Sequence, residues 1–500
     1  MTRNIFQDAC MNLVSSKSLK EATTWLNLTI GLFLIVIVLY QVSSTVADPD
    51  LWGYLAFGKL FWSSGKFPYR DVFSYVPTLN PWVYHEWLTG VFFYPLYQNL
   101  GTTGLQIFKY LMALATFWLV YLTARKRGAY FFAFALVLVM AIGWIQLGYA
   151  TVRAQVFTYF FFAFTLYLLE NARLKNRWGG LWLVILIQVF WCNLHGGFLA
   201  GLGLISLYAL GEFISGRYFI PYLWTLLLAT LSTLINPYGI AYQNYILRAV
   251  SMPRPAIWEW MSIKQAYLIG VISWREILML LCMLIFGLSL MWRNHWKDIT
   301  ATLTLCITLC LGVLHIRHIV FFYLLMAAYF PDLINCYVGD LKSKPRVMEG
   351  LRSFGIIGPV VVITMMTAVI AFSFLKQSPL SINVPSKPGS GLYYPVGAVA
   401  YIQEHKLSGK LLTEEFHWGE YLLWNLYPQC KVALDGRYET VYPDEIAKKY
   451  FADFSQFLAD YPPDMVLIGI RSNLYRMLKS DQRWREVYAD AGCTLFINGL

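Results

Sequence analysis

The chain has 500 residues, of which 58% are hydrophobic and only 13% are charged, and its mean hydropathy is +0.51. This composition excludes an ordinary soluble globular protein and indicates an integral membrane protein. The net charge of +11 is better explained by basic loops that fix orientation in a bilayer than by nucleic-acid binding, so we expect no nucleic-acid partner.

Apolar runs recur along the first three quarters of the sequence, each close to the roughly 20 residues that a helix needs to cross a bilayer. We therefore predict an α-helical polytopic membrane protein with about eleven transmembrane helices. The predicted spans are residues 24–46, 104–124, 129–147, 154–170, 180–195, 198–213, 219–235, 276–292, 298–315, 318–336 and 353–375. The first run lacks a small-residue cleavage site, so we interpret it as an uncleaved anchor.

Basic loops predict the orientation of these helices. With the N-terminus in the cytoplasm, the short basic loops all face inward. They contain Arg125, Lys126, Arg127, Arg173, Lys175, Arg177, Arg217, Arg293, Lys297, Lys342, Lys344, Arg346 and Arg352. This orientation requires residues 84–99 to lie along the membrane, because another crossing there would reverse every later loop. We expect residues 84–99 and 50–64, which mix Trp and Tyr with apolar residues, to form interfacial helices.

Almost all the unusual polar residues then fall on the outer side, at span ends or in outer loops. They are Asp48, Asp50, His85, Glu86, Arg153, His195, Asn236, Glu259, Arg317 and His318. Because ionisable groups beside a bilayer are costly, such a collection indicates a binding or catalytic face. The alternative is that polar residues collect wherever helices end.

Asp48 and Asp50 flank Pro49 just beyond the first predicted span. A carboxylate there could act as a general base toward an acceptor hydroxyl, or the pair could bind a divalent cation such as Mg²⁺ or Mn²⁺. The alternative is that Asp50 caps the helix that follows. The sequence has no Cys-x-x-Cys or Cys/His ligand spacing, and it leaves a metal requirement open.

The sequence changes character after residue 376. A linker rich in Pro, Ser and Gly covers residues 378–391, and strand-like and helix-like segments then alternate. We predict strands at 410–414, 431–435, 465–470 and 494–498, and helices near 396–406, 419–426, 444–459 and 472–479. The predicted organisation is a transmembrane domain over 1–376, with a first outer loop at 47–103, followed by a soluble α/β domain over 377–500 on the outer side. Cys430 and Cys493 in this domain could be bonded or free.

Several motifs extend over most of the chain. They are Asp48-Pro49-Asp50-Leu51-Trp52, Asp71-x-Phe73-Ser74-Tyr75, Trp82-x-x-His85-Glu86-Trp87-Leu88, Asn193-Leu194-His195-Gly196-Gly197-Phe198, Asn236-Pro237-Tyr238-Gly239, Arg317-His318, Trp418-Gly419-Glu420-Tyr421-Leu422 and Asp435-Gly436-Arg437-Tyr438-Glu439-Thr440-Val441-Tyr442. Together they resemble a bacterial set of multi-span GT-C glycosyltransferases. That set is similar to the mannosyl- and aminoarabinose-transferases that use lipid-phosphate sugars. One departure is Trp52-Gly53, where many relatives have two tryptophans.

The resemblance implies a module with a first span, an outer loop with two membrane-parallel helices and an acidic motif, and further spans. It implies that Asp48 or Asp50 is the catalytic carboxylate, and Asp48 is slightly favoured because Asp50 has the capping alternative. The phosphate that leaves the polyprenyl carrier needs cationic groups, for which Arg153 and Arg317 are the best matches. Arg153 could equally pair structurally with Glu259 or Glu86.

The remaining candidates are assigned to substrate binding. His85 and His195 could hydrogen-bond the sugar or the phosphate, although a histidine at a helix end is also often a polar cap. Asn236, which precedes a proline, could simply break a span. The predicted substrate-binding set is His85, Glu86, Arg153, His195, Asn236, Arg317 and His318. Asp435-Gly436-Arg437 could dock the tail onto the membrane domain or contact an acceptor, and we favour docking.

We therefore expect an inverting glycosyltransferase of a bacterial inner membrane, with its N-terminus in the cytoplasm and its tail in the periplasm. The expected partners are membrane lipid, a polyprenyl-phosphate sugar donor and a glycan, lipid or protein acceptor, and residues 377–500 could also bind a protein. The rival interpretation is a non-catalytic GT-C-like scaffold or subunit of a larger assembly. A transporter is less well supported, because ionisable residues within the spans are scarce.

Overall fold

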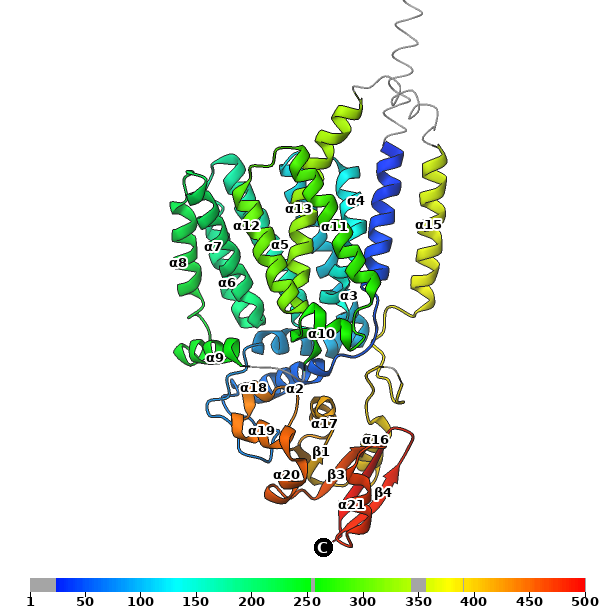
Figure 1. The fold of residues 1–500 in the computed structure, drawn as a ribbon. Coiled ribbons are helices and arrows are strands. Elements are labelled where there is room, and N and C mark those ends of the chain that lie inside the picture. Colours follow the sequence, from blue (N-terminus) through cyan, green and yellow to red (C-terminus); the bar gives the residue numbers. More distant parts are fainter. Residues whose placement is uncertain (1–23, 253–256, 343–356, 390, 500) are drawn as a thin grey trace, which may run out of the picture.

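The computed structural model describes residues 24–252, 257–342, 357–389 and 391–499. Each predicted span contains a helix among its described residues, and the long helices run side by side in one bundle (Figure 1). These helices are Thr24–Gln41, α3 (Trp87–Lys126), α4 (Phe131–Ile145), α5 (Gln155–Lys175), α6 (Trp182–Leu194), α7 (Leu199–Ile214), α8 (Ile220–Ser232), α11 (Trp274–Arg293), α12 (Ile299–Leu314), α13 (Ile319–Lys342) and α15 (Ile357–Lys376).

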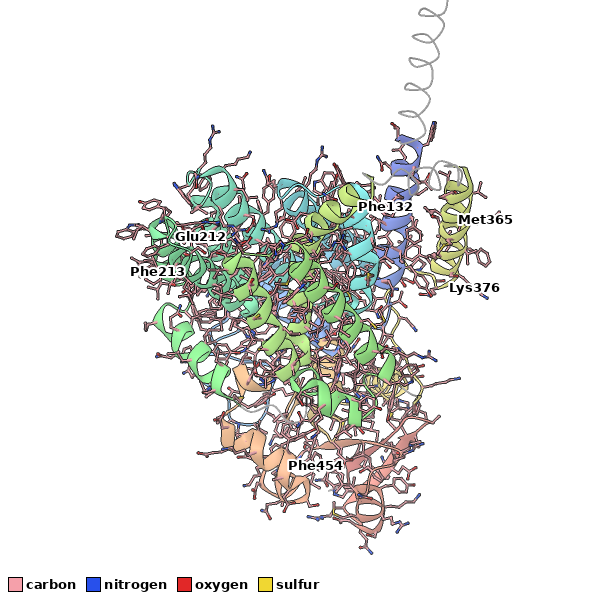
Figure 2. The ribbon with its side chains drawn as sticks, turned by 45° about the horizontal axis from the view of Figure 1, so that its top comes forward. Phe132, Glu212, Phe213, Met365, Lys376 and Phe454 are labelled. Atoms are coloured by element: carbon pink, nitrogen blue, oxygen red, sulfur yellow. The ribbon has the colours of Figure 1, made fainter. Side chains whose placement is uncertain are left out.

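The bundle has the length and surface of a membrane domain. Among the described residues, seven helices are long and apolar enough to cross a bilayer, and α6, α8 and α12 are apolar but shorter. Phe213 of α7 and Met365 of α15 are exposed by 59% and 64%, and their side chains point away from the bundle (Figure 2). Outward apolar side chains suit contact with lipid. The protein is therefore an integral membrane protein.

Two helices at one end of the bundle carry the first outer loop. α2 (Pro49–Ser64) packs on the start of α3, where a Cβ on Gly58 would overlap the carbonyl oxygen of Gly90. Gly101 then breaks α3 with a φ of 61°. The 40 residues of α3 are about twice what a crossing needs, and the break separates 84–99 from the span at 104–124 as predicted. In Figure 1 α2 lies between the bundle and the C-terminal domain.

The opposite end of the bundle is joined by a buried ion network. The guanidinium of Arg173 on α5 contacts Asp298 at 2.7 Å, and that of Arg127 at the end of α3 contacts the same carboxylate at 3.1 Å. Further carboxylates from three helices complete it: Glu170, Glu212 and Asp332. Because every charge has a partner, burial of these groups is tolerated, and α3, α5, α7, α12 and α13 are tied together.

The tail folds as an α/β domain around a five-stranded sheet with the order β2-β1-β3-β5-β4. β2, β1 and β3 are parallel, whereas β5 is antiparallel to both β3 and β4. The strands are β1 (Gly409–Thr413), β2 (Cys430–Val432), β3 (Met465–Gly469), β4 (Trp484–Ala489) and β5 (Cys493–Asn498). The helices are α16 (Val396–Glu404), α17 (Gly419–Leu426), α18 (Tyr438–Val441), α19 (Asp444–Ala452), α20 (Phe454–Asp460) and α21 (Leu474–Ser480).

The predicted strands correspond to β1, β2, β3 and β5, and the prediction missed β4. β4 is an edge strand with no fully buried residue, so it lacks the alternating apolar pattern that identifies a half-buried strand. The single helix predicted over 444–459 is two helices, because Asp453 leaves helical geometry and caps α20 through its side chain.

Cys430 and Cys493 are both free and buried. They lie on β2 and β5, which are separated in the sheet by β1 and β3. Neighbouring strands are about 4.8 Å apart, so these cysteines are about 14 Å apart, beyond the reach of a disulfide. The structure therefore decides against the bonded alternative.

The tail is joined to the outer loop by backbone and side-chain contacts. Val46 pairs with Asn383 and Ser74 pairs with Val432 as isolated β-bridges. Arg437 donates to Asp71 at 2.8 Å. These contacts confirm the prediction that Asp435-Gly436-Arg437 docks the tail, and they place its surface against the first outer loop.

Candidate functional site

One cavity of about 920 Å³ lies between the bundle, α2 and the tail. It is lined by all the predicted site residues except Asn236, namely Asp48, Asp50, His85, Glu86, Arg153, His195, Arg317 and His318. These residues come from the start of α2, the segment before α3 and the ends of α5, α6 and α13. The chain therefore brings together residues that are far apart in the sequence.

Arg153 is the centre of the acidic side of this cavity. Its guanidinium contacts Asp50 at 2.5 Å, Glu259 at 2.6 Å and Asp48 at 3.4 Å. The alternative of a pairing with Glu259 is therefore present, but it coexists with contacts to both aspartates. One cation surrounded by three carboxylates leaves an excess of negative charge at this wall.

Asp48, and not Asp50, caps α2. Asp48 is the N-cap of α2 and accepts a hydrogen bond from the backbone N–H of Asp50 at 3.1 Å. The alternative that Asp50 caps the helix is therefore wrong: Asp50 lies inside the first turn, where its carboxylate contacts Arg153. The Asp50 side chain is 31% exposed and that of Asp48 only 7%, so Asp50 is the aspartate more open to the cavity.

Burial and neighbouring charges shift the pKa values of the carboxyl groups on this side of the cavity. Burial raises the pKa of Asp48 to about 7, and the charge of Asp50 adds to this effect, whereas Arg153 opposes it. Thr151 also donates to Asp48 at 2.5 Å. Although burial alone would raise the pKa of Glu259, the guanidinium groups of Arg153 and Arg317 hold it below its usual value. Glu259 is therefore ionised, and Asp48 carries a proton part of the time near neutral pH.

Glu86 lies between two imidazoles. One of its carboxylate oxygens is 3.4 Å from Nε2 of His195 and 3.6 Å from Nε2 of His85. Burial, with the charge of Asp50, raises the pKa of Glu86 to about 8, while a hydrogen bond from Tyr54 opposes the shift. This group can therefore exchange a proton near neutral pH.

The contacts of His195 fix its tautomer. Its Nδ1 accepts the backbone N–H of Gly197 at 2.9 Å and lies 2.7 Å from the hydroxyl of Thr158. Thr158 accepts from the indole of Trp191 at 2.8 Å, so its own proton points to His195. Nδ1 is therefore an acceptor, and the neutral ring carries its proton on Nε2, which faces Glu86.

Arg317 and His318 form a second cationic and polar wall. Arg317 stacks on the ring of Trp260 at 4.6 Å and acts on Glu259 through its charge, but within the described part of the chain it makes no hydrogen bond and no direct ion-pair contact. Nδ1 of His318 is buried, also without a hydrogen-bond partner among the described residues. A buried ring nitrogen without a partner requires an explanation, and a ligand in the cavity that both groups line would supply it.

Asn236 lies away from the cavity. Its side chain accepts from the backbone N–H of Tyr238 at 2.8 Å and donates to the carbonyl of Thr233 at 2.8 Å. Both bonds are local turn contacts of the kind that asparagine makes before a proline. The structure thus assigns Asn236 the alternative role of ending the helix.

The tail completes the cavity with residues outside the predicted substrate-binding set. His417, Glu420, Arg437 and Glu439 line it, and Tyr245 of α9 (Ile240–Ser251) donates to Glu439 at 3.2 Å. The motifs that contain Glu420, Arg437 and Glu439 supported the resemblance, but nothing in the local sequence indicated that a soluble domain reaches a membrane cavity.

The carboxylates do not provide a metal site as they stand. Across the described ranges, no group of three or more His, Cys, Asp and Glu side chains is arranged to hold a metal ion. Asp48 and Asp50 face the guanidinium of Arg153, whose charge occupies the place that a cation would take. The residues therefore do not fit the divalent cation considered for this pair.

Comparisons with known proteins agree with this architecture. No protein-family model matches the chain, and no curated protein matches it in sequence. Among the solved structures similar to it are ArnT from Cupriavidus metallidurans bound to undecaprenyl phosphate, with 13% identity and a TM-score of 0.50, and the same protein in the apo state, with 12% identity and a TM-score of 0.51. Each alignment covers 95% of this chain and 98% of the other. The chain therefore has the fold of ArnT, which agrees with the polytopic helical domain and the C-terminal α/β domain predicted from the sequence.

Proposed function

We propose that the protein is a glycosyltransferase that moves a sugar from a polyprenyl-phosphate carrier to an acceptor hydroxyl. The observation that carries this proposal is the pairing of Asp50 with Arg153 in the same cavity as Arg317, which has no ion pair within the described part of the chain. A carboxylate that can accept a proton and a cation that can receive a phosphate are the two groups that such a transfer needs.

The donor phosphate binds at Arg317 and His318. The guanidinium of Arg317 stacks on Trp260 and keeps its N–H donors available for phosphate oxygens, and His318 can donate to or accept from the same group. Support comes from the similar fold of ArnT, one structure of which has undecaprenyl phosphate bound. The apolar lining of the cavity, which includes Leu207 and Leu311, suits the first isoprene units.

The reaction is a single displacement with inversion. The acceptor oxygen attacks the anomeric carbon as its proton passes to the carboxylate of Asp50. The bond between that carbon and the phosphate oxygen breaks, and its electron pair leaves with the lipid phosphate. Arg317 neutralises the charge that develops there. Asp50 fits the base better than Asp48, because Asp48 caps α2 and is nearly closed off from the cavity.

The remaining polar groups bind the sugar and the acceptor. Glu86 with His85 and His195 presents carboxylate and N–H groups to the cavity, and such pairs bind the hydroxyl groups of sugars. We place this cavity and the tail on the periplasmic side of a bacterial inner membrane, with the N-terminus in the cytoplasm, because the basic loops favour that orientation.

A reconstituted assay tests the proposal. The protein in proteoliposomes receives a radiolabelled polyprenyl-phosphate sugar, and transfer is followed by the release of the lipid phosphate. Asp50→Asn should remove transfer while native mass spectrometry still detects bound undecaprenyl phosphate. Arg317→Gln should weaken that binding, whereas Arg217→Gln, beyond the far end of α7, should not. Full transfer by Asp50→Asn would refute the role of Asp50.

The same variants distinguish a glycosyltransferase from a non-catalytic scaffold. A scaffold would tolerate substitution of both Asp50 and Arg153 and would co-purify with other subunits. Unchanged growth and assembly with these variants, together with no lipid-phosphate binding by the native protein, would favour that interpretation.

A further inference from the structure

Lys109 is a charged residue on α3 that the proposed reaction does not use. Its side chain is completely buried. A lysine in the interior of a membrane protein is costly unless its ammonium group has strong partners, and such residues usually have a function.

The partners of Lys109 are backbone carbonyls of two separate segments. Its Nζ donates to the carbonyl of Ser44 at 2.8 Å and to that of Ala150 at 3.5 Å. Gln106, one turn earlier on α3, donates to the same carbonyl of Ser44 at 3.1 Å. The terminal nitrogen of a lysine has at least two N–H donors in either protonation state, so it is suited to hold two carbonyls at once.

These two segments lead directly to the acidic wall of the cavity. Ser44 precedes Asp48 by four residues, and Ala150 precedes Arg153 by three. On the cavity side the same segments meet again through Thr151 with Asp48 and through Arg153 with Asp50. Lys109 therefore binds the backbone of the same two segments whose side chains contact each other at the cavity.

The linker to the tail is bound at the same place on α3. Gln106 donates to the hydroxyl of Tyr110 at 2.9 Å, and that hydroxyl donates to the carbonyl of Pro379 at 2.6 Å. One turn of a single helix thus contacts the segments before Asp48, before Arg153 and before the tail.

We propose that Lys109 is a positioning residue that fixes the distance between the Asp50 and Arg153 segments. The expected effect on turnover rests on the proposed function. The claim that Lys109 holds the two segments together does not. We call the two hydrogen bonds of Lys109 to Ser44 and Ala150 the clamp. If the clamp is lost, Asp50 and Arg153 are still present, but the distance between them is no longer fixed. Since a displacement of about 1 Å can reduce an enzymatic rate by about 100-fold, turnover should depend on Lys109.

The test compares three variants of the full-length protein. Lys109→Met keeps the volume of the side chain and removes its donors, whereas Lys109→Gln keeps N–H donors. Lys59→Met removes an exposed lysine of α2 that lies over Trp424 and serves as the matched control. Hydrogen exchange of residues 43–48 and 149–153 is measured by mass spectrometry without substrate, and turnover and donor KM are measured per folded protein.

We expect hydrogen exchange to change only in the two segments that Lys109 contacts. In Lys109→Met, exchange in the two segments should rise about tenfold while the rest of the bundle keeps its protection, and kcat should fall about 100-fold with donor KM nearly unchanged. Lys109→Gln should fall between this variant and the native protein, and Lys59→Met should match the native protein.

Two outcomes would overturn the proposal. Unchanged exchange in both segments would show that Lys109 does not hold them, and raised exchange throughout the bundle in both Lys109 variants would show a general structural role. If the native protein transfers no sugar, the proposed function fails, and the exchange data alone still decide whether the clamp exists.

Discussion

The backbone N–H of Gly53 in α2 donates to the carboxylate of Glu420 in α17 at 2.8 Å, across 367 residues of sequence. A Cβ on residue 53 would overlap that carboxylate, so a larger residue here would force the Glu420 side chain to move. This contact accounts for the glycine that follows Trp52. The space beside the acidic motif is occupied by the tail.

Gly53→Ala should therefore loosen the tail from the membrane domain. Overlap in a packed contact costs about 1–3 kcal/mol, so we expect a lower melting temperature and faster proteolysis of the linker at residues 378–391. Gly180→Ala is the control, because a Cβ there has open space. Equal proteolysis of the two variants would contradict the role of Gly53.

The two aspartates should differ when each is replaced by asparagine. Asparagine caps a helix as well as aspartate does, so Asp48→Asn should keep the stability of α2 and part of the activity. Asp50→Asn should lose the proposed general base and reduce kcat by about 100-fold or more. The double variant should be inactive but remain in the membrane, as judged by flotation. A larger loss from Asp48→Asn would reverse the assignment.

Stability should fall as the pH rises because of Glu86. Burial raises the pKa of this carboxyl from 4.5 to about 8, so between these values the folded protein holds a proton that the unfolded chain releases. The free energy of unfolding therefore declines across this window. Glu86→Gln removes the titration and should flatten the decline of the melting temperature between pH 5 and pH 8. Glu404→Gln, exposed on α16, should leave the slope as in the native protein.

The buried ion network at the other end of the bundle should affect stability and not chemistry. Asp298 contacts both Arg127 and Arg173 and caps α12. Asp298→Asn keeps the cap and removes the charge, which leaves buried cations less compensated and should cost about 3–5 kcal/mol. Thermal unfolding in detergent should show this loss, while turnover per folded protein stays at the native level. A specific drop in turnover would connect this network to the cavity.

The architecture could be predicted from the sequence, because it depends on patterns that extend over many residues. The span at 104–124 and the strand at 465–470 could be predicted, since apolar length and β-branched residues are local signals. The position of polar residues at one end of the predicted helices also allowed the prediction that Arg153 and Glu86 share one site.

The roles within that site were harder to predict. Which of Asp48 and Asp50 caps α2 depends on a shift of two residues in the helix start, and such boundaries are the least certain part of a sequence prediction. Glu420 and Lys109 were missed because their importance comes from contacts with Gly53 and Ser44, which no local pattern encodes. Asn236 was included because a polar residue at a helix end can have either a structural or a functional role.

The pairing of Val46 with Asn383 has a consequence for biosynthesis. The segment that leads to the acidic motif is among the first parts of the protein to leave the ribosome, and its partner follows more than three hundred residues later. A nascent chain can insert its helices, but the cavity that the tail helps to line is incomplete until the last quarter of the chain has been translated and has folded. Premature termination anywhere before that point would yield an inserted protein without a closed wall.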